Sequence, residues 1–321
     1  MVSNMDITKI AEILKSSDRI ALAIHKNPDS DCVGSSTALL IALRSLGKTV
    51  NIFVEGNIPG RLSFLVEEDY FNSDTQPYDV CVAIDVASIE LMGCVKEAVF
   101  DKANTTCCID HHGTNSGYAN YNFVDGSAAA AGELVYSFIK DYLGCTITSD
   151  IAMRLYAAIA SDTGSFQYSN TTPQTHIIAS ELMAVGMDAP FVMRTLFERK
   201  TAEQLQLKAD VTNNLRFYED GKICVALVDE PMLSKYKMAF EEADDIAALP
   251  RSIIGVEVGV YIKVKGEKEC KISLRSNEYT DVSAIAKLWG GGGHLRAAGL
   301  TIRETPEIAE KQLIEAIKKV I

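Results

Sequence analysis

The stretch that decides the fold of this chain is residues 19–35, which read RIALAIHKNPDSDCVGS. Residues 19–24 form a compact apolar run, which is typical of a buried strand. A turn containing Pro28 follows, and apolar residues then recur at helical spacing over residues 33–46. One histidine and two aspartates lie in the turn, at residues 25–31. The stretch therefore predicts a strand, a polar turn and a helix, which is the building unit of a parallel sheet.

The same alternation of apolar strands and helices continues through the first 122 residues. Further strands are expected at residues 50–54, 79–84 and 105–109, and further helices at residues 7–14 and 89–100. Continuous apolar strands that alternate with helices are typical of a parallel sheet covered on both faces. The first part of the chain is therefore predicted to be α/β.

Helical patterns dominate the middle of the chain, and strands return after it. Helices are expected at residues 128–142, 149–161, 175–185 and 188–217, strands at 223–228, 256–264 and 269–275, and helices at 282–288 and 306–320. The window at 188–217 is long and polar, so part of it is interpreted as a connector. The prediction is an α/β chain with a parallel-sheet domain at 1–193, a helical linker at 194–215 and a smaller α/β domain at 216–321.

Composition and charge exclude several classes of protein. The 321 residues carry 31 Lys and Arg against 43 Asp and Glu, a formal net charge of −12, and 47% are hydrophobic, as in ordinary globular proteins. The acidity argues against a protein that holds long DNA or RNA, because such proteins bind phosphates through many Lys and Arg side chains. The eight cysteines include no Cys-x-x-Cys pair, which favours the reducing cytoplasm. We expect neither an export signal nor a membrane-spanning segment.

Histidine and aspartate side chains follow several of the predicted elements. Asp85 comes directly after a strand, Asp162 ends a helix, and the other candidates are His25, Asp29, Asp31, Asp110, His111 and His112. Loops at the carboxyl ends of parallel strands converge on one crevice, so these segments can meet there. Carboxylates packed together repel one another strongly, and divalent cations are the usual remedy. We therefore predict a metal site at this edge of the sheet.

Six of these residues are suitable metal ligands, namely His25, Asp29, Asp31, Asp85, His111 and Asp162. A mixed set of imidazoles and carboxylates suits Mn²⁺ better than Ca²⁺ or a thiolate zinc site, and six ligands suit two ions that share a carboxylate. Two such ions would clamp the attacking and leaving oxygens of phosphoester hydrolysis. Taken singly, each aspartate could instead be a helix N-cap, Asp31 included, and Cys32 could pack in the core rather than touch a metal.

A glycine-rich stretch forms the second strong signal, at residues 290–299, which read GGGGHLRAAG. We expect the glycines to run into a helix of small residues, whose N-terminal N–H groups would bind an anion. His294 and Arg296 could add hydrogen bonds to a phosphate, and the planar guanidinium of Arg275 suits bidentate phosphate binding. Residues 251–300 agree with this interpretation, since they carry eight Lys and Arg against five Asp and Glu. A flexible hinge has the same composition, so the glycines alone leave both interpretations open.

Together these residues resemble the motifs of the DHH phosphoesterase family, which is named for the triplet found here at residues 110–112. The segment at residues 25–31, Asp85 and Asp162 match the other motifs in order. The Gly-Gly-Gly-His segment is similar to the DHH-associated C-terminal domain of the nanoRNase and pAp-phosphatase subfamily. The resemblance covers residues 20–299. It implies a metal-dependent enzyme with a pair of Mn²⁺ ions, for which Mg²⁺ or Co²⁺ can substitute.

The resemblance also implies a role for each residue. One ion would be held by His25, Asp29 and Asp85, and the other by Asp31, Asp85, His111 and Asp162. Asp110 would orient the triplet, and His112 would face the scissile phosphate as a hydrogen-bond donor or acid. Arg275, Gly291, Gly292, Gly293 and His294 would grip the terminal phosphate and nucleotide of the substrate, with Arg296 as a less well defined contact. The active site would lie in the cleft between the two domains.

The substrates implied by the resemblance are small and phosphorylated. Within this family, the length, the charge and the Gly-Gly-Gly-His segment favour a stand-alone phosphoesterase. They argue against RecJ-type exonucleases, membrane-bound cyclic-dinucleotide phosphodiesterases and family II inorganic pyrophosphatases. We expect hydrolysis of very short RNA, of two to five nucleotides, of linear dinucleotides such as pApA and of the 3′-phosphate of pAp, releasing nucleoside monophosphates. Cyclic di-AMP is an alternative substrate, and a non-catalytic nucleotide-binding module is the alternative of another class. A homodimer that binds neither long nucleic acid nor a membrane is also implied.

Overall fold

Five parallel strands form the first sheet, in the order β2-β1-β3-β4-β5. They are β1 (Arg19–Ala23), β2 (Thr49–Phe53), β3 (Val80–Ile84), β4 (Thr105–Asp110) and β5 (Tyr121–Val124). The computed structural model describes residues 5–71 and 77–321. The first four strands confirm the predicted parallel sheet. The prediction missed β5, a four-residue edge strand that is only partly buried and shows no continuous apolar run.

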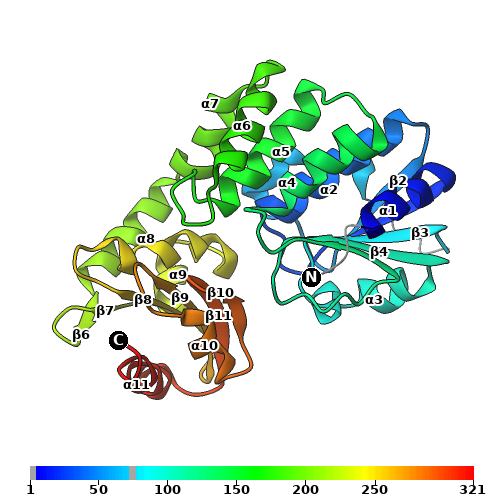
Figure 1. The fold of residues 1–321 in the computed structure, drawn as a ribbon. Coiled ribbons are helices and arrows are strands. Elements are labelled where there is room, and N and C mark those ends of the chain that lie inside the picture. The colour runs from blue at the N-terminus through cyan, green and yellow to red at the C-terminus, as the bar shows by residue number, and fades with distance from the viewer. Residues whose placement is uncertain (1–4, 72–76) are drawn as a thin grey trace. The chain divides into compact units, whose positions relative to one another are not determined.

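Helices cover both faces of this sheet. They are α1 (Met5–Ser16), α2 (Ser30–Ser45), α3 (Val95–Ala98), α4 (Ala131–Ser137), α5 (Ser149–Asp162), α6 (Pro173–Ala184) and α7 (Ala189–Met193). Alternate residues of β1 enter different hydrophobic clusters: Leu22 packs in the cluster that holds Leu39 and Leu155, and Ala21 in the one that holds Val95. In Figure 1, α2, α4 and α5 lie on one side of the sheet and α3 lies on the other. The sheet is therefore covered on both faces, as predicted.

The helical stretch predicted near residues 89–100 is divided into two short pieces. Gly93, whose backbone φ is +57°, separates a 3-10 turn at Ile89–Met92 from the single helical turn of α3. The positive φ at Gly93 disfavours a larger residue there.

The predicted helix at residues 188–217 is divided into separate pieces. A π-helical turn, Arg194–Glu198, follows α7, and the backbone becomes extended at Arg199. The side chain of Thr201 then accepts a hydrogen bond from the N–H of Gln204 and caps a new helix, α8 (Ala202–Asn213). The chain divides into two compact units, Met1–Arg199 and Lys200–Ile321, so α8 belongs to the second unit.

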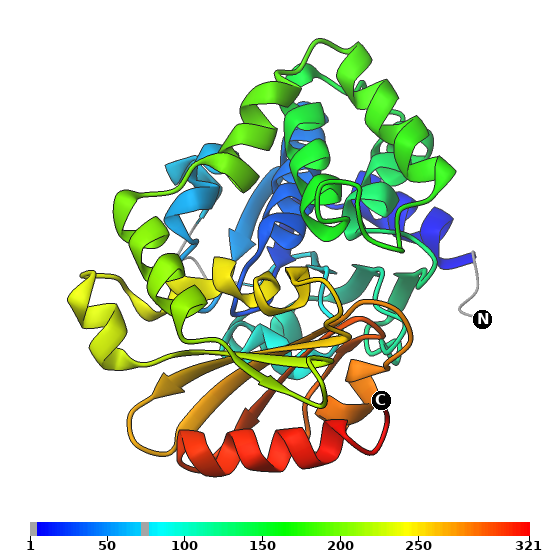
Figure 2. The ribbon, with the colours of Figure 1, turned by 90° about the vertical axis from the view of Figure 1, so that its left-hand side faces the viewer.

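A six-stranded mixed sheet forms the second unit, in the order β10-β11-β9-β8-β7-β6. The strands are β6 (Arg216–Tyr218), β7 (Ile223–Val228), β8 (Val258–Lys265), β9 (Glu269–Ser276), β10 (Gly292–His294) and β11 (Ala297–Ile302), and the further helices are α9 (Glu230–Lys235), α10 (Val282–Lys287) and α11 (Pro306–Ile317). Strands β7 and β8 pair in parallel, and the other neighbours are antiparallel. Ile262 packs with Leu313 of α11 on one face, and Tyr261 with Leu207 of α8 on the other. Figure 2 shows α11 lying along the sheet.

The helix predicted after the glycine run is wrong, because residues 292–302 form a β-hairpin. Strand β10 pairs antiparallel with β11, with His294 opposite Ala297. Buried and more exposed residues alternate along β11, which is a strand pattern. A Cβ at Gly293 would lie 2.5 Å from the carbonyl oxygen of Ala297. Glycine at this position therefore allows the backbones of the two strands to approach closely. The anion site expected at a helix N-terminus is therefore absent from this described segment.

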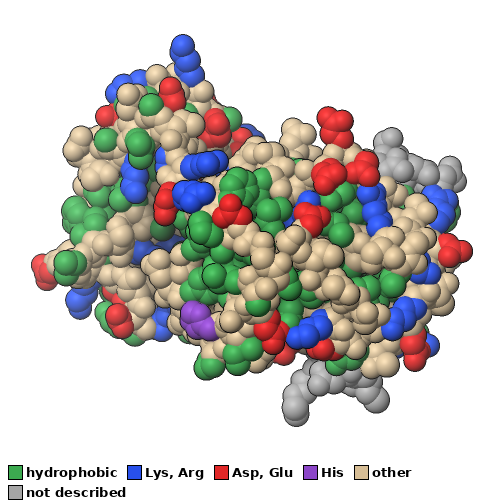
Figure 3. Space-filling view, turned by 90° about the horizontal axis from the view of Figure 1, so that it is seen from above, with side chains coloured by type: hydrophobic (Ala, Val, Ile, Leu, Met, Phe, Trp, Pro, Cys, Tyr) green, Lys and Arg blue, Asp and Glu red, His purple; other side chains and the backbone are tan. Residues whose placement is uncertain are grey.

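On the face seen in Figure 3, acidic and basic side chains are interspersed. Within the described residues, no single helix is long and apolar enough to cross a membrane. Helix α6 and the segment Ala189–Glu198 reach that length and apolar composition only when taken together, and the two are bent by 120° relative to each other.

Candidate metal centre

The turn after β1 supplies three of the predicted ligands. Asp29 is the N-cap of α2, and its Oδ1 accepts hydrogen bonds from the backbone N–H of Asp31 (3.0 Å) and Cys32 (3.1 Å). Asp31 therefore lies in the first turn of the helix and is not its N-cap. His25 lies beside the cap, with its Nε2 3.9 Å from Asp29 Oδ1. The cap thus holds the two aspartates and the histidine on one side of the turn.

Asp31 is fully buried and is held by three hydrogen-bond donors. Its Oδ1 accepts from the hydroxyl of Ser35 (3.0 Å) and the N–H of Gly132 (2.9 Å), and its Oδ2 accepts from the N–H of Ala131 (2.7 Å). Burial, with the nearby charge of Asp162, raises the pKa of Asp31 to about 7. Because Ala131 and Gly132 begin α4, two helices together fix the orientation of this carboxylate.

Asp85 lies at the centre of the cluster, directly after β3. Its backbone φ is +57°, in the left-handed region, and its N–H donates to the carbonyl of Ile109 at 3.0 Å. Its Oδ1 lies 3.5 Å from His111 Nε2 and 3.5 Å from His112 Nδ1, and its Oδ2 lies 4.0 Å from His25 Nε2. Burial, with the neighbouring carboxylates, holds the pKa of Asp85 well above its usual value. The buried Oδ1 accepts no hydrogen bond from any residue that the structure describes.

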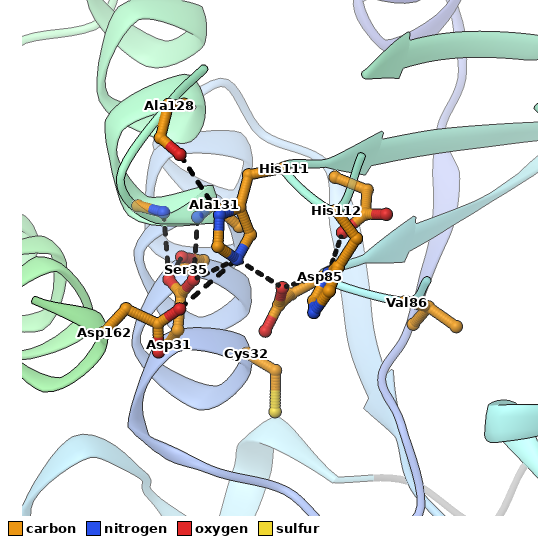
Figure 4. Close-up of polar contacts among 12 residues, drawn as sticks. Asp31, Cys32, Ser35, Asp85, Val86, His111, His112, Ala128, Ala131 and Asp162 are labelled. Atoms are coloured by element: carbon orange, nitrogen blue, oxygen red, sulfur yellow. Dashed lines mark hydrogen bonds and ion pairs between the residues drawn. The ribbon is translucent and has the colours of Figure 1, made fainter. Parts of the chain in front are cut away.

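His111 and Asp162 complete the cluster (Figure 4). His111 Nε2 lies 3.3 Å from Asp162 Oδ2, 3.5 Å from Asp85 Oδ1 and 3.6 Å from Asp31 Oδ2. On the other side of the ring, Nδ1 lies 3.3 Å from the carbonyl oxygen of Ala128. Because a carbonyl oxygen only accepts hydrogen bonds, Nδ1 is the donor. Burial alone would lower the pKa of His111, but the hydrogen bond with Asp162 and the charge of Asp31 raise it to about 10. A cation that displaces the Nε2 proton would meet the same three carboxylates.

His112 is oriented by a hydrogen-bond network that ends on Asn115. His112 Nδ1 lies 2.8 Å from Asp110 Oδ1, and because a carboxylate only accepts, Nδ1 carries the proton. Asn115 Nδ2 donates to Asp110 Oδ2 at 2.7 Å and to the carbonyl of Val86 at 3.1 Å. Burial alone would raise the pKa of Asp110, but the hydrogen bond with His112 lowers it. Sequence reasoning missed Asn115, whose only signal is an amide three positions after the histidines.

The donor groups around Asp85 are close enough together to hold a metal ion. Ligand atoms of His25, Asp29, Cys32 and Asp85 all lie within 4.8 Å of one another, and so do those of Asp31, Asp85 and His111. Burial, with the charge of Asp29, holds the pKa of Cys32 well above its usual value, which favours packing over a thiolate ligand. A cation would satisfy the buried Oδ1 of Asp85 and offset the repulsion among the carboxylates. The cluster can therefore hold divalent cations.

The second unit brings two of the predicted phosphate contacts onto one row of its sheet. Ala297 of β11 pairs with His294 of β10 on one side and with Arg275 of β9 on the other, so the three side chains share a face. His294 is exposed and Arg275 is partly buried. Arg296, in contrast, donates from Nη1 to the carbonyl of Thr280 at 2.9 Å and so fastens the loop before α10. The sheet therefore presents Arg275 of β9 and His294 of β10 on the same face.

Comparisons with known proteins give one consistent result. The N-terminal domain of the DHH family matches residues 19–159, and the DHHA1 domain matches residues 220–321. The bifunctional oligoribonuclease and PAP phosphatase NrnA of Thermus thermophilus is 32% identical over 316 residues, which are 97% of this chain and 93% of the relative. The protein of that name from Bacillus subtilis is 27% identical over 298 residues, which are 92% and 93%. The crystal structure of an exopolyphosphatase-related protein from Bacteroides fragilis matches with a TM-score of 0.90 at 24% identity, covering 99% and 97%, and so shares the fold.

Proposed function

The chain belongs to the DHH family of phosphoesterases, and on this basis we propose that it hydrolyses very short oligoribonucleotides, including pApA, and the 3′-phosphate of pAp to nucleoside monophosphates. The observation that carries the proposal is Asp85, whose carboxylate belongs to several groups of possible metal ligands, among them one with His25 and Asp29 and one with Asp31 and His111. Two cations held close together by a shared carboxylate could clamp the attacking and leaving oxygens of phosphoester hydrolysis. The names of the two NrnA relatives support the same substrates.

The proposed cofactor is a pair of Mn²⁺ ions, for which Mg²⁺ or Co²⁺ can substitute. His25, Asp29 and Asp85 would hold one ion, and the second would be held by Asp31, Asp85, His111 and Asp162. Bound divalent cations would lower the pKa of an attacking water and offset the charge of the phosphoryl oxygens. Asp110 accepts a hydrogen bond from Nδ1 of His112 and so orients the ring, whose opposite edge would face the scissile phosphate. When the ring is protonated at both nitrogens, that edge would donate a hydrogen bond or a proton.

Removal of metal is expected to lower hydrolysis of pApA by at least about a hundredfold, because the carboxylates alone repel an anionic substrate. The protein would be stripped with a chelator, assayed, and assayed again after Mn²⁺ is restored. Recovery with Mn²⁺ supports the proposal, and full activity of the stripped protein contradicts it.

A panel of substrates tests the reaction itself. The panel holds pApA, short RNAs, pAp, cyclic di-AMP, pyrophosphate and long single strands, each assayed with the Mn²⁺-restored protein. We expect the highest kcat/KM with pApA, the shortest RNAs and pAp. A preference for cyclic di-AMP would show that cyclic di-AMP, and not short RNA, is the main substrate. A preference for pyrophosphate would contradict the proposed subfamily, and binding of pApA without turnover would mean that the protein is a non-catalytic binding module.

The molecular mass of the protein in solution, measured by light scattering, tests the proposed homodimer.

Arg275 is expected to contribute mainly to substrate capture. Replacing it with alanine should raise KM for pApA about 10-fold to 100-fold with little change in kcat, because a charge-assisted hydrogen bond to phosphate contributes about 1.5–3 kcal/mol. The control is Lys311→Ala, which removes the same charge from α11 on the other face of the sheet. Unchanged kinetic constants in Arg275→Ala would mean that the phosphate pocket lies elsewhere.

A further inference from the structure

Three helices around the candidate metal centre meet at two glycines. A Cβ at Gly34 of α2 would lie 2.5 Å from the carbonyl oxygen of Arg154 in α5. A Cβ at Gly132 of α4 would lie 2.8 Å from the Cβ of Ala158, also in α5, and 3.2 Å from Ile159 Cγ1. Neither glycine has a positive φ, so only the lack of space explains them. Since glycine in a helix costs about 0.5–1 kcal/mol relative to alanine, the close approach must offset that cost.

The junction of these helices lies close to two of the carboxylates. Asp31 precedes Gly34 by three residues on α2, and Asp162 follows Ala158 by four residues on α5, so each carboxylate is about one helical turn from the contact. Gly132 itself donates its N–H to Asp31 Oδ1 at 2.9 Å. The hydroxyl of Ser30 adds a bond between the helices, donating to the carbonyl of Ala157 at 3.1 Å. The separation of the helices therefore sets the separation of the carboxylates.

We infer that Gly34, Gly132 and Ala158 are positioning residues that fix the spacing of Asp31 and Asp162 for a divalent cation. The inference rests on the proposed function only in taking these carboxylates as metal ligands. Ligand distances at a metal site are defined to about 0.2 Å, whereas a Cβ at 2.8 Å from another carbon must displace one helix by more than that. An extra methyl group at the junction therefore changes the geometry of the metal site without touching a ligand.

The test compares two alanine variants and one compensating glycine. Gly132→Ala should weaken Mn²⁺ binding to the full-length, metal-stripped protein about tenfold or more, measured by titration calorimetry. It should also speed hydrogen exchange of the amides at residues 131–132, which donate to Asp31. Because the nearest obstacle is the Cβ of Ala158, adding Ala158→Gly should restore both readouts. Gly34→Ala should weaken Mn²⁺ binding too, but Ala158→Gly should not restore it, because its nearest obstacle is a backbone oxygen.

The control is Gly60→Ala, where a Cβ meets nothing within 4 Å, and it should bind Mn²⁺ as the parent does. Wild-type affinity and exchange in Gly132→Ala would overturn the inference, and so would equal rescue of both alanine variants by Ala158→Gly. If Gly132→Ala does not fold, Ala158→Ser, which adds one atom at the same contact, should weaken Mn²⁺ binding, and unchanged affinity would again overturn the inference. Neither Mn²⁺ affinity nor hydrogen exchange needs a substrate. If the protein hydrolyses none of the proposed substrates but shows these changes in Mn²⁺ affinity and exchange, the proposed function is wrong and the inference about the glycines still holds.

Discussion

Replacing Asp85 with asparagine is expected to lower kcat/KM for pApA by at least about a thousandfold, or about 4 kcal/mol of transition-state stabilisation. The reason is that Asp85 contributes both to the group with His25 and Asp29 and to the group with Asp31 and His111, so one neutral amide weakens both proposed ion sites. Titration calorimetry with Mn²⁺ should show loss of affinity at both sites. An active variant with normal Mn²⁺ binding would show that Asp85 does not bridge two ions.

Asparagine is the appropriate replacement because it preserves the backbone. The φ of +57° at Asp85 is one that asparagine adopts more readily than most residues, so the turn after β3 should persist. Without metal, the variant should have a melting temperature no lower than that of the parent. Burial and the neighbouring carboxylates raise the pKa of Asp85 well above its usual value, which means that the charged carboxylate is unfavourable in the folded protein, and the substitution removes it. The matched control is Asp101→Asn, which removes the same charge at an exposed position and should keep both activity and Mn²⁺ affinity.

Replacing Asp110 with asparagine is expected to lower kcat for pApA by about a hundredfold to a thousandfold with KM nearly unchanged. The Asp110 carboxylate accepts hydrogen bonds from both His112 Nδ1 and Asn115 Nδ2. An amide has a single acceptor oxygen and no charge, so it cannot serve both donors and holds the His112 ring less firmly. Steady-state kinetics on the Mn²⁺-restored protein measure the effect. His176→Gln, a change on the exposed side of α6, serves as the histidine control.

A double variant decides whether Asp110 acts through His112. If it does, Asp110→Asn combined with His112→Gln should be no slower than His112→Gln alone. If the losses in kcat from the two single variants add up in the double variant, Asp110 acts on the metal centre independently of His112, for example through the hydrogen bond that it accepts from Asn115.

The parallel sheet could be predicted because its signal is local. Strands β1 to β4 are rich in apolar residues, and the helix α2 that follows β1 shows apolar residues at helical spacing. The position of the candidate ligands followed from this, because residues that follow parallel strands lie at one edge of a sheet. The structure brings His25, Asp31, Asp85 and His111 together at that edge; their role in binding metal stays a prediction.

The glycine-rich segment could not be predicted in the same way. Glycine has no side chain, so residues 290–293 show neither the period of a helix nor that of a strand. The pairing of β10 with β11, which decides the outcome, depends on backbone approach. Gly34 and Gly132 were missed for a related reason, since their neighbour Ala158 is distant in sequence and its contact is visible only in three dimensions.

The order of strands in the first sheet has a consequence for how the protein matures. The candidate ligands come from four segments between His25 and Asp162, and β1 lies between β2 and β3 in the sheet, so a partly made chain cannot assemble the cluster. A cation that binds this cluster therefore binds the finished unit and not its unfolded chain. By mass action, free metal at a hundred times its dissociation constant would add about 2.7 kcal/mol to the free energy of unfolding. The supply of metal would then affect the stability of the folded unit as well as its activity.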